Sequence, residues 1–360
     1  MYYVGRWSET VRSTRPGQDG GGKLAATIRD IKKMTGLSLA TVSKYLNGGN
    51  VLPENRLAIE HAIEVLHYEV NEVARGLATN KTKTVGVLIE RFDNIFAGTV
   101  ISEIEDILRA HDYGTIVCDC RGDEKLEEES IKFLLGKRVD GILTIPTSRS
   151  SKYLQAASDR EVPVVLVDRA FEDRDWDSVL VDNTAASYEA VKSLIQRGHR
   201  KIAIICGEDK FYTARMRLQG YFKAMEEADL PIYPRYIKRG RLEVEHGYHS
   251  ITELLKMEDS PTAVFLSNYE ITLGAVIALN EKGVRFPDDI SIIGFDNMML
   301  SQVVKPNLWM VVQPMQEIAR HAAQMLLDRM AGRVPETTEK ITLKTSLLPG
   351  DSVADLSIKP

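Results

Sequence analysis

The side chains with the clearest binding chemistry share one side of a short predicted helix, residues 39–46. They are small, hydroxyl, basic and amide groups: Leu39, Ala40, Ser43, Lys44 and Asn47. Val42 and Leu46, four residues apart, point to the opposite side, and Ser38 is a suitable N-cap. A short second helix that offers such groups at its N-terminal end is typical of helices that enter the major groove of DNA. A helical hairpin without a DNA partner is the alternative interpretation.

Two further helices are expected to position this surface. Ile28, Ile31 and Met34 recur at steps of three and predict the apolar face of a first helix. Gly36 ends that helix, because glycine readily adopts the left-handed conformation. A third helix is predicted over residues 53–66. The three helices should pack around five apolar side chains: Ile31, Val42, Leu46, Ile59 and Ile63.

Charge is distributed unevenly along the 360 residues. Residues 1–83 contain 12 basic and 8 acidic residues, a net charge of +4, whereas the whole chain carries −5. A basic head on an acidic body suits a protein whose N-terminal part alone approaches phosphate. The three cysteines lie in apolar runs, which favours buried thiols over disulfides or a metal site.

No apolar run reaches the length of a membrane span, and the first 24 residues lack the apolar core of a secretion signal. We therefore expect a cytoplasmic protein with no membrane partner. The histidines form no zinc-protease motif, and no nucleophile elbow or dinucleotide-binding turn occurs. An enzyme is therefore not expected, although α/β sheets support many chemistries.

The chain after residue 84 alternates between apolar runs and helix-length amphipathic stretches, which predicts parallel sheets covered on both faces. The runs that predict strands are residues 85–89, 115–120, 141–145, 162–167, 179–181, 201–206, 263–266 and 291–295. The predicted helices are residues 98–111, 124–137, 150–159, 185–198, 213–228, 245–257 and 269–283. Eight strands suit two sheets better than one, with a break near residues 182–185. Ligands bind at the carboxyl ends of the strands in such folds.

Ten short motifs, in this order, resemble the lac repressor/galactose repressor family of bacterial transcription regulators. They are T-I-R-D-I (27–31), G-L-S-L-A-T-V-S-K-Y-L-N (36–47), A-R-G-L (74–77), V-G-V-L-I (85–89), D-N-I-F (93–96), K-R-V-D-G-I (137–142), P-V-V-L-V-D-R (163–169), R-G-H-R-K-I-A (197–203), R-L-Q-G-Y (217–221) and I-I-G-F-D-N (292–297). The resemblance covers residues 26 to about 350. It implies a homodimer with a helix-turn-helix head and two parallel-sheet lobes like those of periplasmic binding proteins, without a cofactor or metal.

The resemblance also implies a domain organisation. Residues 1–25 are expected to be a disordered extension, 26–70 the helix-turn-helix domain, and 71–83 a hinge helix and linker. Residues 84–350 would form the effector-binding and dimerisation domain. Its first lobe is expected at about 84–182 and 314–342, and its second at about 185–312 and 343–353.

By the same resemblance, Leu39, Ala40 and Lys44 occupy base-reading positions on a palindromic operator. Lysine can donate to guanine, whereas leucine and alanine can only contact thymine methyl groups. The expected phosphate contacts are Ser38, Thr41, Ser43, Asn47 and Asn50. Ala74 and Leu77 belong to the hinge helix, where Leu77 matches the apolar wedge that the family inserts into the minor groove. Leu77 packing on the first lobe is the alternative.

The effector implied by the resemblance is a small molecule, most simply a carbohydrate, bound between the lobes. The residues expected to contact it are Phe96, Asp168, Arg169, Arg217, Asn268 and Asp296. A structural ion pair between Arg217 and Asp296 is the alternative. Leu242 and Tyr269 depart from the residues common in the family, so other ligand classes stay open. The recognition stretch also resembles the catabolite-control subgroup, whose corepressor is a phosphorylated carrier protein. A solute-binding protein without a DNA-binding role is the rival function.

Overall fold

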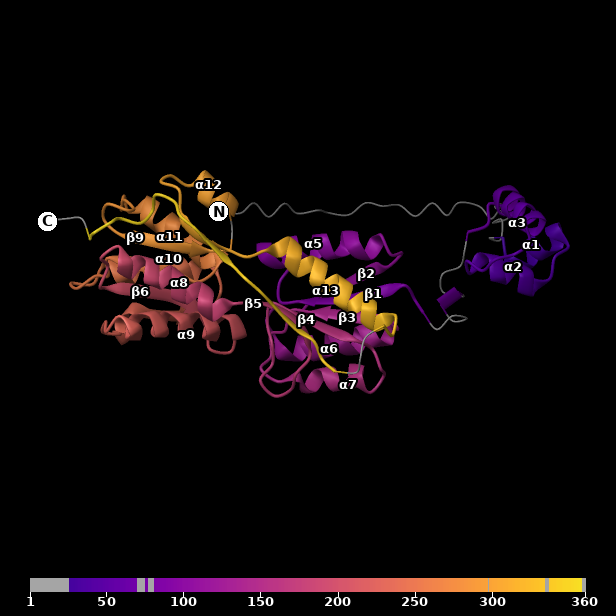
Figure 1. Cartoon of the computed structure of the whole chain (residues 1–360), viewed down its shortest axis with the longest axis horizontal. Helices are drawn as coiled ribbons and strands as arrows, with labels where there is room; N and C mark the ends of the chain where they lie inside the picture. Colours follow the sequence, from indigo (N-terminus) through magenta and orange to yellow (C-terminus); the bar gives the residue numbers. More distant parts are fainter. Residues whose placement is uncertain (1–25, 70–74, 77–80, 297, 334–336, 358–360) are drawn as a thin grey trace, which may run out of the picture. The chain divides into compact units, whose positions relative to one another are not determined.

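The computed structural model describes residues 26–69, 75–76, 81–296, 298–333 and 337–357. The chain divides between Asn80 and Lys81 into two compact units (Figure 1). The predicted extension, residues 1–25, lies outside the described residues.

Within residues 26–69, the N-terminal unit contains the helices α1 (Ile28–Thr35), α2 (Leu39–Leu46) and α3 (Pro53–Leu66). Gly36 follows α1 with a φ of 70°, in the left-handed conformation that glycine adopts without strain. Ser38 caps α2, and its hydroxyl oxygen accepts a hydrogen bond from the backbone N–H of Thr41 at 3.1 Å. The turn between the two helices therefore has the geometry that the sequence predicts.

The core of this unit is small, and its fully buried residues are Ile31, Val42, Ile59 and Ala62. Leu46 and Ile63, which we predicted to be central, are only half-buried at its edge. The expectation for Met34 is wrong, since 42% of its surface is exposed. Tyr45 takes part instead, with its ring against the core and its hydroxyl donating to Glu60 at 2.8 Å.

The second unit contains two six-stranded sheets with matching strand orders. The first sheet runs β11-β5-β4-β3-β1-β2 with parallel neighbours throughout. The second runs β12-β10-β9-β8-β6-β7, parallel except for β12, which is antiparallel to β10. The bounds are β1 (Thr84–Ile89), β2 (Gly114–Asp119), β3 (Gly141–Thr144), β4 (Val164–Val167), β5 (Asp177–Val181), β6 (Ile202–Gly207), β7 (Ile237–Gly240), β8 (Ala263–Leu266), β9 (Ser291–Phe295), β10 (Trp309–Val312), β11 (Lys340–Leu343) and β12 (Ser346–Leu348).

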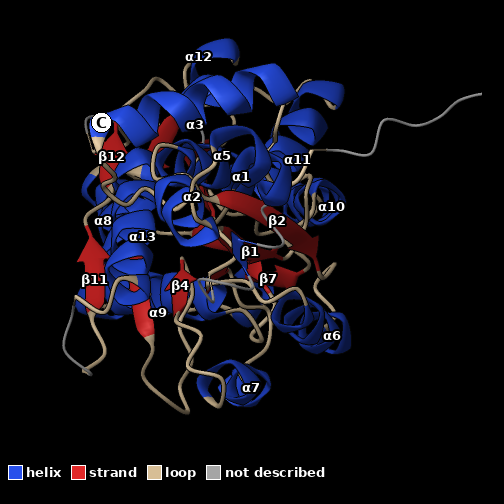
Figure 2. Cartoon of the chain, turned by 90° about the vertical axis from the view of Figure 1, so that its right-hand side faces the viewer, coloured by secondary structure: helices blue, strands red, loops and turns tan. Residues whose placement is uncertain are grey.

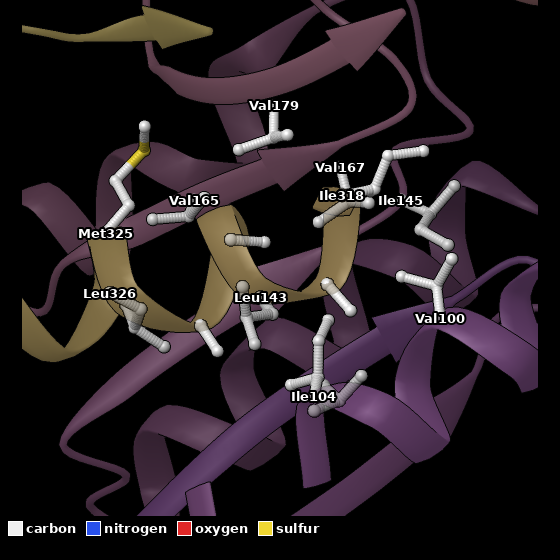
Figure 3. Packing of buried hydrophobic residues seen from close by; sticks show 14 of the residues in the cluster. Val100, Ile104, Leu143, Ile145, Val165, Val167, Val179, Ile318, Met325 and Leu326 are labelled. Atoms are coloured by element: carbon white, nitrogen blue, oxygen red, sulfur yellow. The ribbon is translucent and has the colours of Figure 1, made fainter. Parts of the chain in front are cut away.

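Helices cover both faces of the first sheet, and together they make the first lobe. On one face lie α5 (Ile95–Arg109) and α13 (Met315–Met330), and on the other α6 (Glu124–Gly136), η1 (Ser151–Leu154) and α7 (Gln155–Ser158) (Figure 1). Figure 3 shows Ile318 and Leu326 of α13 packed with Ile104 of α5 and Leu143 of β3. Burying such apolar side chains stabilises the fold by about 1.5–3 kcal/mol each.

The second lobe is built in the same way. On one face lie α8 (Asn183–Gln196) and α9 (Tyr212–Glu227), and on the other α10 (Val244–Leu255) and α11 (Tyr269–Glu281). Two shorter helices complete it, η2 (Pro234–Tyr236) and α12 (Met298–Val303). Each helix pair meets at glycine: a Cβ at Gly220 would overlap the carbonyl oxygen of Thr184, and one at Gly274 would overlap that of Val244.

The described chain passes between the lobes three times, namely between β5 and α8, between β10 and α13, and between β11 and β12. The first and third passages are joined, because Thr345 donates two hydrogen bonds to the Asp182 carboxylate, from its backbone N–H at 2.9 Å and its hydroxyl at 3.0 Å. The third passage leads from β11 to β12, and each of these strands lies at one edge of its sheet (Figure 2).

The predicted fold class of two α/β lobes behind a helical head is confirmed. Four strands were not predicted: β7, β10, β11 and β12. β7, β11 and β12 contain no buried residue and give no apolar run, whereas β10 is an apolar run of only four residues, too short to be assigned by periodicity alone. The three cysteines are free thiols, and burial raises the pKa of each. None of the described helices is both long and apolar enough to cross a membrane.

Candidate functional site

The predicted DNA-reading side chains of α2 are exposed, in contrast to its buried residue Val42. Leu39 is 38% exposed, and Ala40 and Lys44 are exposed beside it. The stem of Lys44 lies against Gly49, where a Cβ would approach the lysine Cγ to 2.7 Å. Lys44 is therefore supported along its stem while its ammonium group stays available.

The predicted phosphate contacts surround this face and are joined by hydrogen bonds. The hydroxyls of Ser38 and Thr41 lie 2.8 Å apart, and the Asn47 amide donates to Ser43 Oγ at 3.3 Å. Asn50 is exposed in the loop after α2. Hydroxyl and amide groups held in this way can donate to phosphate oxygens and set the register of a bound duplex.

The predicted hinge residues are not covered by the structure. Ala74 and Leu77 lie outside the described residues. Between them, Arg75 and Gly76 are helical.

The six predicted effector-binding residues line one cavity between the lobes. They lie with Glu90, Asn94, Ala97, Ile145, Thr213, Leu242 and Gln313. The first lobe supplies Phe96, Asp168 and Arg169, and the second supplies Arg217, Asn268 and Asp296. The cavity lies at the carboxyl ends of the strands, where open parallel sheets bind ligands.

Asp168 and Asp296 occupy equivalent places in the two lobes. Each follows a strand, β4 or β9, and each has a left-handed backbone, with φ of 66° and 84°. Each also donates its backbone N–H to a carbonyl of the next strand, at Val179 (2.9 Å) and Val311 (2.8 Å). Non-glycine residues rarely adopt this conformation, and those that do are concentrated at functional sites.

Arg217 is held mainly by neutral acceptors. It is 4% exposed and donates to Asn183 Oδ1 at 2.7 Å and to the Ser267 carbonyl at 2.6 Å. Its guanidinium lies 3.7 Å from the ring centroid of Phe295. The nearest atoms of Arg217 and Asp296 are 4.0 Å apart, so the ion pair that we considered as an alternative lacks a direct hydrogen bond.

Arg169 makes its hydrogen bonds within the first lobe and contacts one ring of the second. It donates to Glu90 at 2.5 Å and to the Pro146 carbonyl at 3.1 Å, and it lies over the Phe211 ring at 4.8 Å. The neighbouring Asp168 is buried, and its Oδ1 has no hydrogen-bond partner among the described residues. A buried carboxylate oxygen without a donor is an incomplete site that a ligand hydroxyl can complete.

Phe96 and Asn268 are less available than the sequence suggests. Phe96 is only 7% exposed and packs mainly in the first-lobe core, so it presents little ring surface for stacking. The Asn268 side chain caps α11 by accepting the Ile271 N–H at 3.0 Å, and its amide donates to Glu270 at 2.6 Å. Both residues line the cavity while their main contacts lie within the protein.

Gln313 is a cavity residue that sequence reasoning missed. It lies in the second passage between the lobes, is 4% exposed and donates to Asp296. Its Oε1 has no partner among the described residues. The signal was the preceding apolar run of β10: recognising that strand would have placed Gln313 at its carboxyl end.

Comparison with known proteins identifies the family. Residues 191–353 match the model of a periplasmic binding protein-like domain. The catabolite control protein A of Priestia megaterium is 36% identical over 307 residues, covering 84% of this chain and 92% of that protein. The repressor PurR of Proteus mirabilis is 35% identical over 333 residues, covering 92% and 97%. The chain belongs to the LacI/GalR family of bacterial transcription regulators.

The solved structures agree with this LacI/GalR assignment. A complex of the transcriptional regulator CelR with cellobiose is 26% identical to this chain, with a TM-score of 0.70, covering 91% of this chain and 99% of that one. The similarity to whole LacI/GalR proteins therefore extends beyond the periplasmic-binding-like segment. The family indicated by the ten motifs is confirmed.

In this LacI/GalR chain, Asp168 should make stability depend on pH. Burial raises its pKa to about 6, although Arg169 and Arg217 act to lower it. The pKa of an aspartate in an unfolded chain is about 4. Between about pH 4 and 6 the folded state therefore binds more protons than the unfolded state, and the protein loses stability as pH rises through that window. We expect Asp168→Asn to make the ligand-free protein more stable at pH 7, by about 3 kcal/mol at most.

Urea unfolding between pH 4 and 7 measures this effect. Asp288→Asn, at an exposed carboxylate in the second lobe, is the matched control and should follow the wild type. Parallel profiles of stability against pH for Asp168→Asn and the wild type would contradict the raised pKa of Asp168.

Proposed function

We propose that this chain is an effector-controlled, operator-binding transcription regulator whose ligand is a polyhydroxylated small molecule, a sugar or sugar derivative. Residues 26–70 would read DNA, 71–83 would form the hinge, and the two lobes from residue 84 would bind the effector and the second subunit. An operator-binding role implies a cytoplasmic protein. The sequence similarity to repressors over the head and body supports the DNA-binding part.

One observation carries the effector assignment: Asp168 and Asp296, from equivalent strand ends of different lobes, line the same buried cavity beside Arg217. Carboxylates accept hydrogen bonds from hydroxyls, while guanidinium and amide groups donate to ring and hydroxyl oxygens. A ligand with several hydroxyls can therefore bridge both lobes. The cellobiose complex of a 26% identical regulator supports a carbohydrate.

Control would act as a population shift. A ligand that contacts both lobes favours the arrangement in which Asp168 and Asp296 lie close together. The lobes can turn only about their three connections, two of which are tied by Asp182 and Thr345. In a homodimer, the relative orientation of the two first lobes would decide whether the paired hinge segments can fold on a palindromic operator.

The operator assignment predicts a loss of specific DNA affinity in Lys44→Ala. Lys44 is exposed on α2 and can donate to guanine, a contact worth about 1–3 kcal/mol of discrimination. We expect at least about a fivefold weaker affinity for a palindromic site of this family, and a smaller change for a scrambled duplex. Fluorescence anisotropy with both duplexes at one salt concentration measures the difference.

Glu64→Ala, on an exposed position of α3, serves as the matched control, and thermal unfolding checks that each head remains folded. If Lys44→Ala lost affinity equally for operator and scrambled DNA, Lys44 would contact only phosphate. Unchanged operator affinity would reject α2 as the reading helix. Leu77→Ala tests the hinge wedge in the same assay, where an unchanged affinity rejects that role.

A further inference from the structure

The effector cavity borders a larger outer chamber of about 430 Å³. Glu90 and Leu242 line both spaces, so the two are adjacent at these side chains. The remaining walls of the outer chamber come from the loops after β1, β2, β6 and β7, and they are rich in charge: Arg91, Phe92, Asp93, Asp119, Arg121, Gly122, Lys210, Phe211, Arg241 and Glu243.

The acidic side chains of this outer chamber already have partners. Asp93 and Glu243 both accept hydrogen bonds from the Arg91 guanidinium, at 2.7 and 3.0 Å. Asp119 accepts backbone N–H groups of Phe92 and Arg121, at 3.2 and 2.7 Å. Glu90 accepts from Arg169, at 2.5 Å. Each of these four carboxylates therefore has a hydrogen-bond donor within the protein, although Asp93 and Glu243 share the single charge of Arg91.

Three basic side chains of the same chamber have weak ion pairs or none among the described residues. The Arg121 guanidinium has no ion-pair partner within the part of the chain that the structure describes. Lys210 has one partly exposed partner, Glu208 at 3.3 Å, and Arg241 shares Glu243 with Arg91 at 3.4 Å. Pairs as exposed as these contribute about 0–1 kcal/mol and exchange readily for a better partner.

These three cations come from opposite walls. Arg121 belongs to the first lobe, after β2, whereas Lys210 and Arg241 follow β6 and β7 of the second lobe. We propose that the effector is a polyol bearing an anionic group, and that Arg121, Lys210 and Arg241 hold this group in the outer chamber. The inference rests on the proposed function, since a hydroxyl of the same molecule would enter the inner cavity, whose volume is about 30 Å³.

A phosphate or carboxylate fits this arrangement. The planar guanidinium forms paired, charge-assisted hydrogen bonds to either group, and the lysine adds a flexible donor. An anion between the walls also relieves the repulsion that lobe closure would otherwise create among the three cations.

A neighbouring chamber of about 590 Å³ is acidic, with Glu243, Glu245 and Glu270 among its lining residues. Glu243 and Glu245 lie at the N-terminal end of α10, where the helix dipole stabilises negative charge. Burial raises the pKa of Glu270 to about 7, which reduces its negative charge near neutral pH. Neither feature requires a cationic ligand.

Isothermal titration calorimetry of the full chain with matched ligand pairs tests the proposal. The pairs are glucose with glucose 6-phosphate, fructose with fructose 6-phosphate, and ribose with ribose 5-phosphate, and glucuronate separates carboxylate from phosphate recognition. At low salt, at least one charged member should bind about tenfold more tightly than its neutral parent. Salt should reduce that advantage.

Arg121→Gln should remove most of the advantage, at least about threefold in affinity, without changing the affinity for the neutral sugar. Lys256→Gln, at the far end of α10, is the matched control and should bind both members as the wild type does. Equal affinity for charged and neutral sugars, or equal losses of both in Arg121→Gln, would overturn the inference while leaving a neutral sugar effector intact. Failure of every sugar and sugar acid to bind would reject the proposed effector class as well.

Discussion

Gly274→Ala is expected to destabilise the effector-binding unit strongly, although it adds a single methyl group in the middle of a helix. A Cβ at Gly274 would overlap the carbonyl oxygen of Val244, and a Cβ at Gly247 on the facing helix would likewise overlap that of Ile271. Helices α10 and α11 would have to separate along their whole contact. Overpacking of this kind costs about 1–3 kcal/mol, and we expect the upper end because the obstacle is backbone.

The matched control is the same substitution at Gly98. That glycine lies within α5, and nothing comes within 4 Å of a Cβ built there. Alanine should therefore stabilise the unit slightly, by about 0.5–1 kcal/mol. Urea unfolding compares the two variants. A Gly274→Ala variant as stable as the wild type would mean that the helices meet less closely than described here.

Arg217→Leu is expected to abolish effector binding and to destabilise the protein by about 3–5 kcal/mol. The guanidinium is the central cation of the cavity, and removing it leaves Asp168 and Asp296 without their shared positive neighbour. It also leaves the acceptors on Asn183 and Ser267 without these donors. Chemical unfolding measures the first effect and calorimetry with a bound sugar the second.

The double variant Arg217→Leu, Asp296→Asn separates structure from binding. Neutralising Asp296 should recover part of the lost stability, since a buried charge no longer needs compensation. Effector binding should stay absent, because both the donor and the acceptor for the ligand are changed. Sugar binding with wild-type affinity in either variant would exclude Arg217 from the site.

The sequence predicted best where burial leaves an uninterrupted apolar signal. Strand β9, buried along its whole length, was predicted within its observed bounds, and that placed Asp296 at a strand end facing the cavity. Gln313 was missed because β10 is a run of only four apolar residues, and periodicity alone does not assign so short a run to a strand. The burial of Phe96 depends on neighbours distant in sequence, which local patterns do not report. The contacts of Asn268 are local, to Glu270 and Ile271, and follow from its place as the N-cap of α11.

The basic residues of the outer chamber could not be predicted from local sequence patterns either. Arg121, Lys210 and Arg241 lie in separate loops more than a hundred residues apart at the extremes, and each resembles an ordinary surface charge. Only the common strand order of the two sheets brings those loops to one opening. The fold topology, and not any local sequence pattern, therefore places these three cations in one chamber.

The passage of the chain between the lobes has a consequence for biosynthesis. The first sheet is completed by β11 (Lys340–Leu343), which pairs with β5 some 160 residues earlier, and its core needs α13. Domains assemble as their residues leave the ribosome, and distant pairings form late. The first lobe of each new molecule must therefore wait, with the edge of β5 and the site for α13 uncovered, until residues 315–343 have been synthesised.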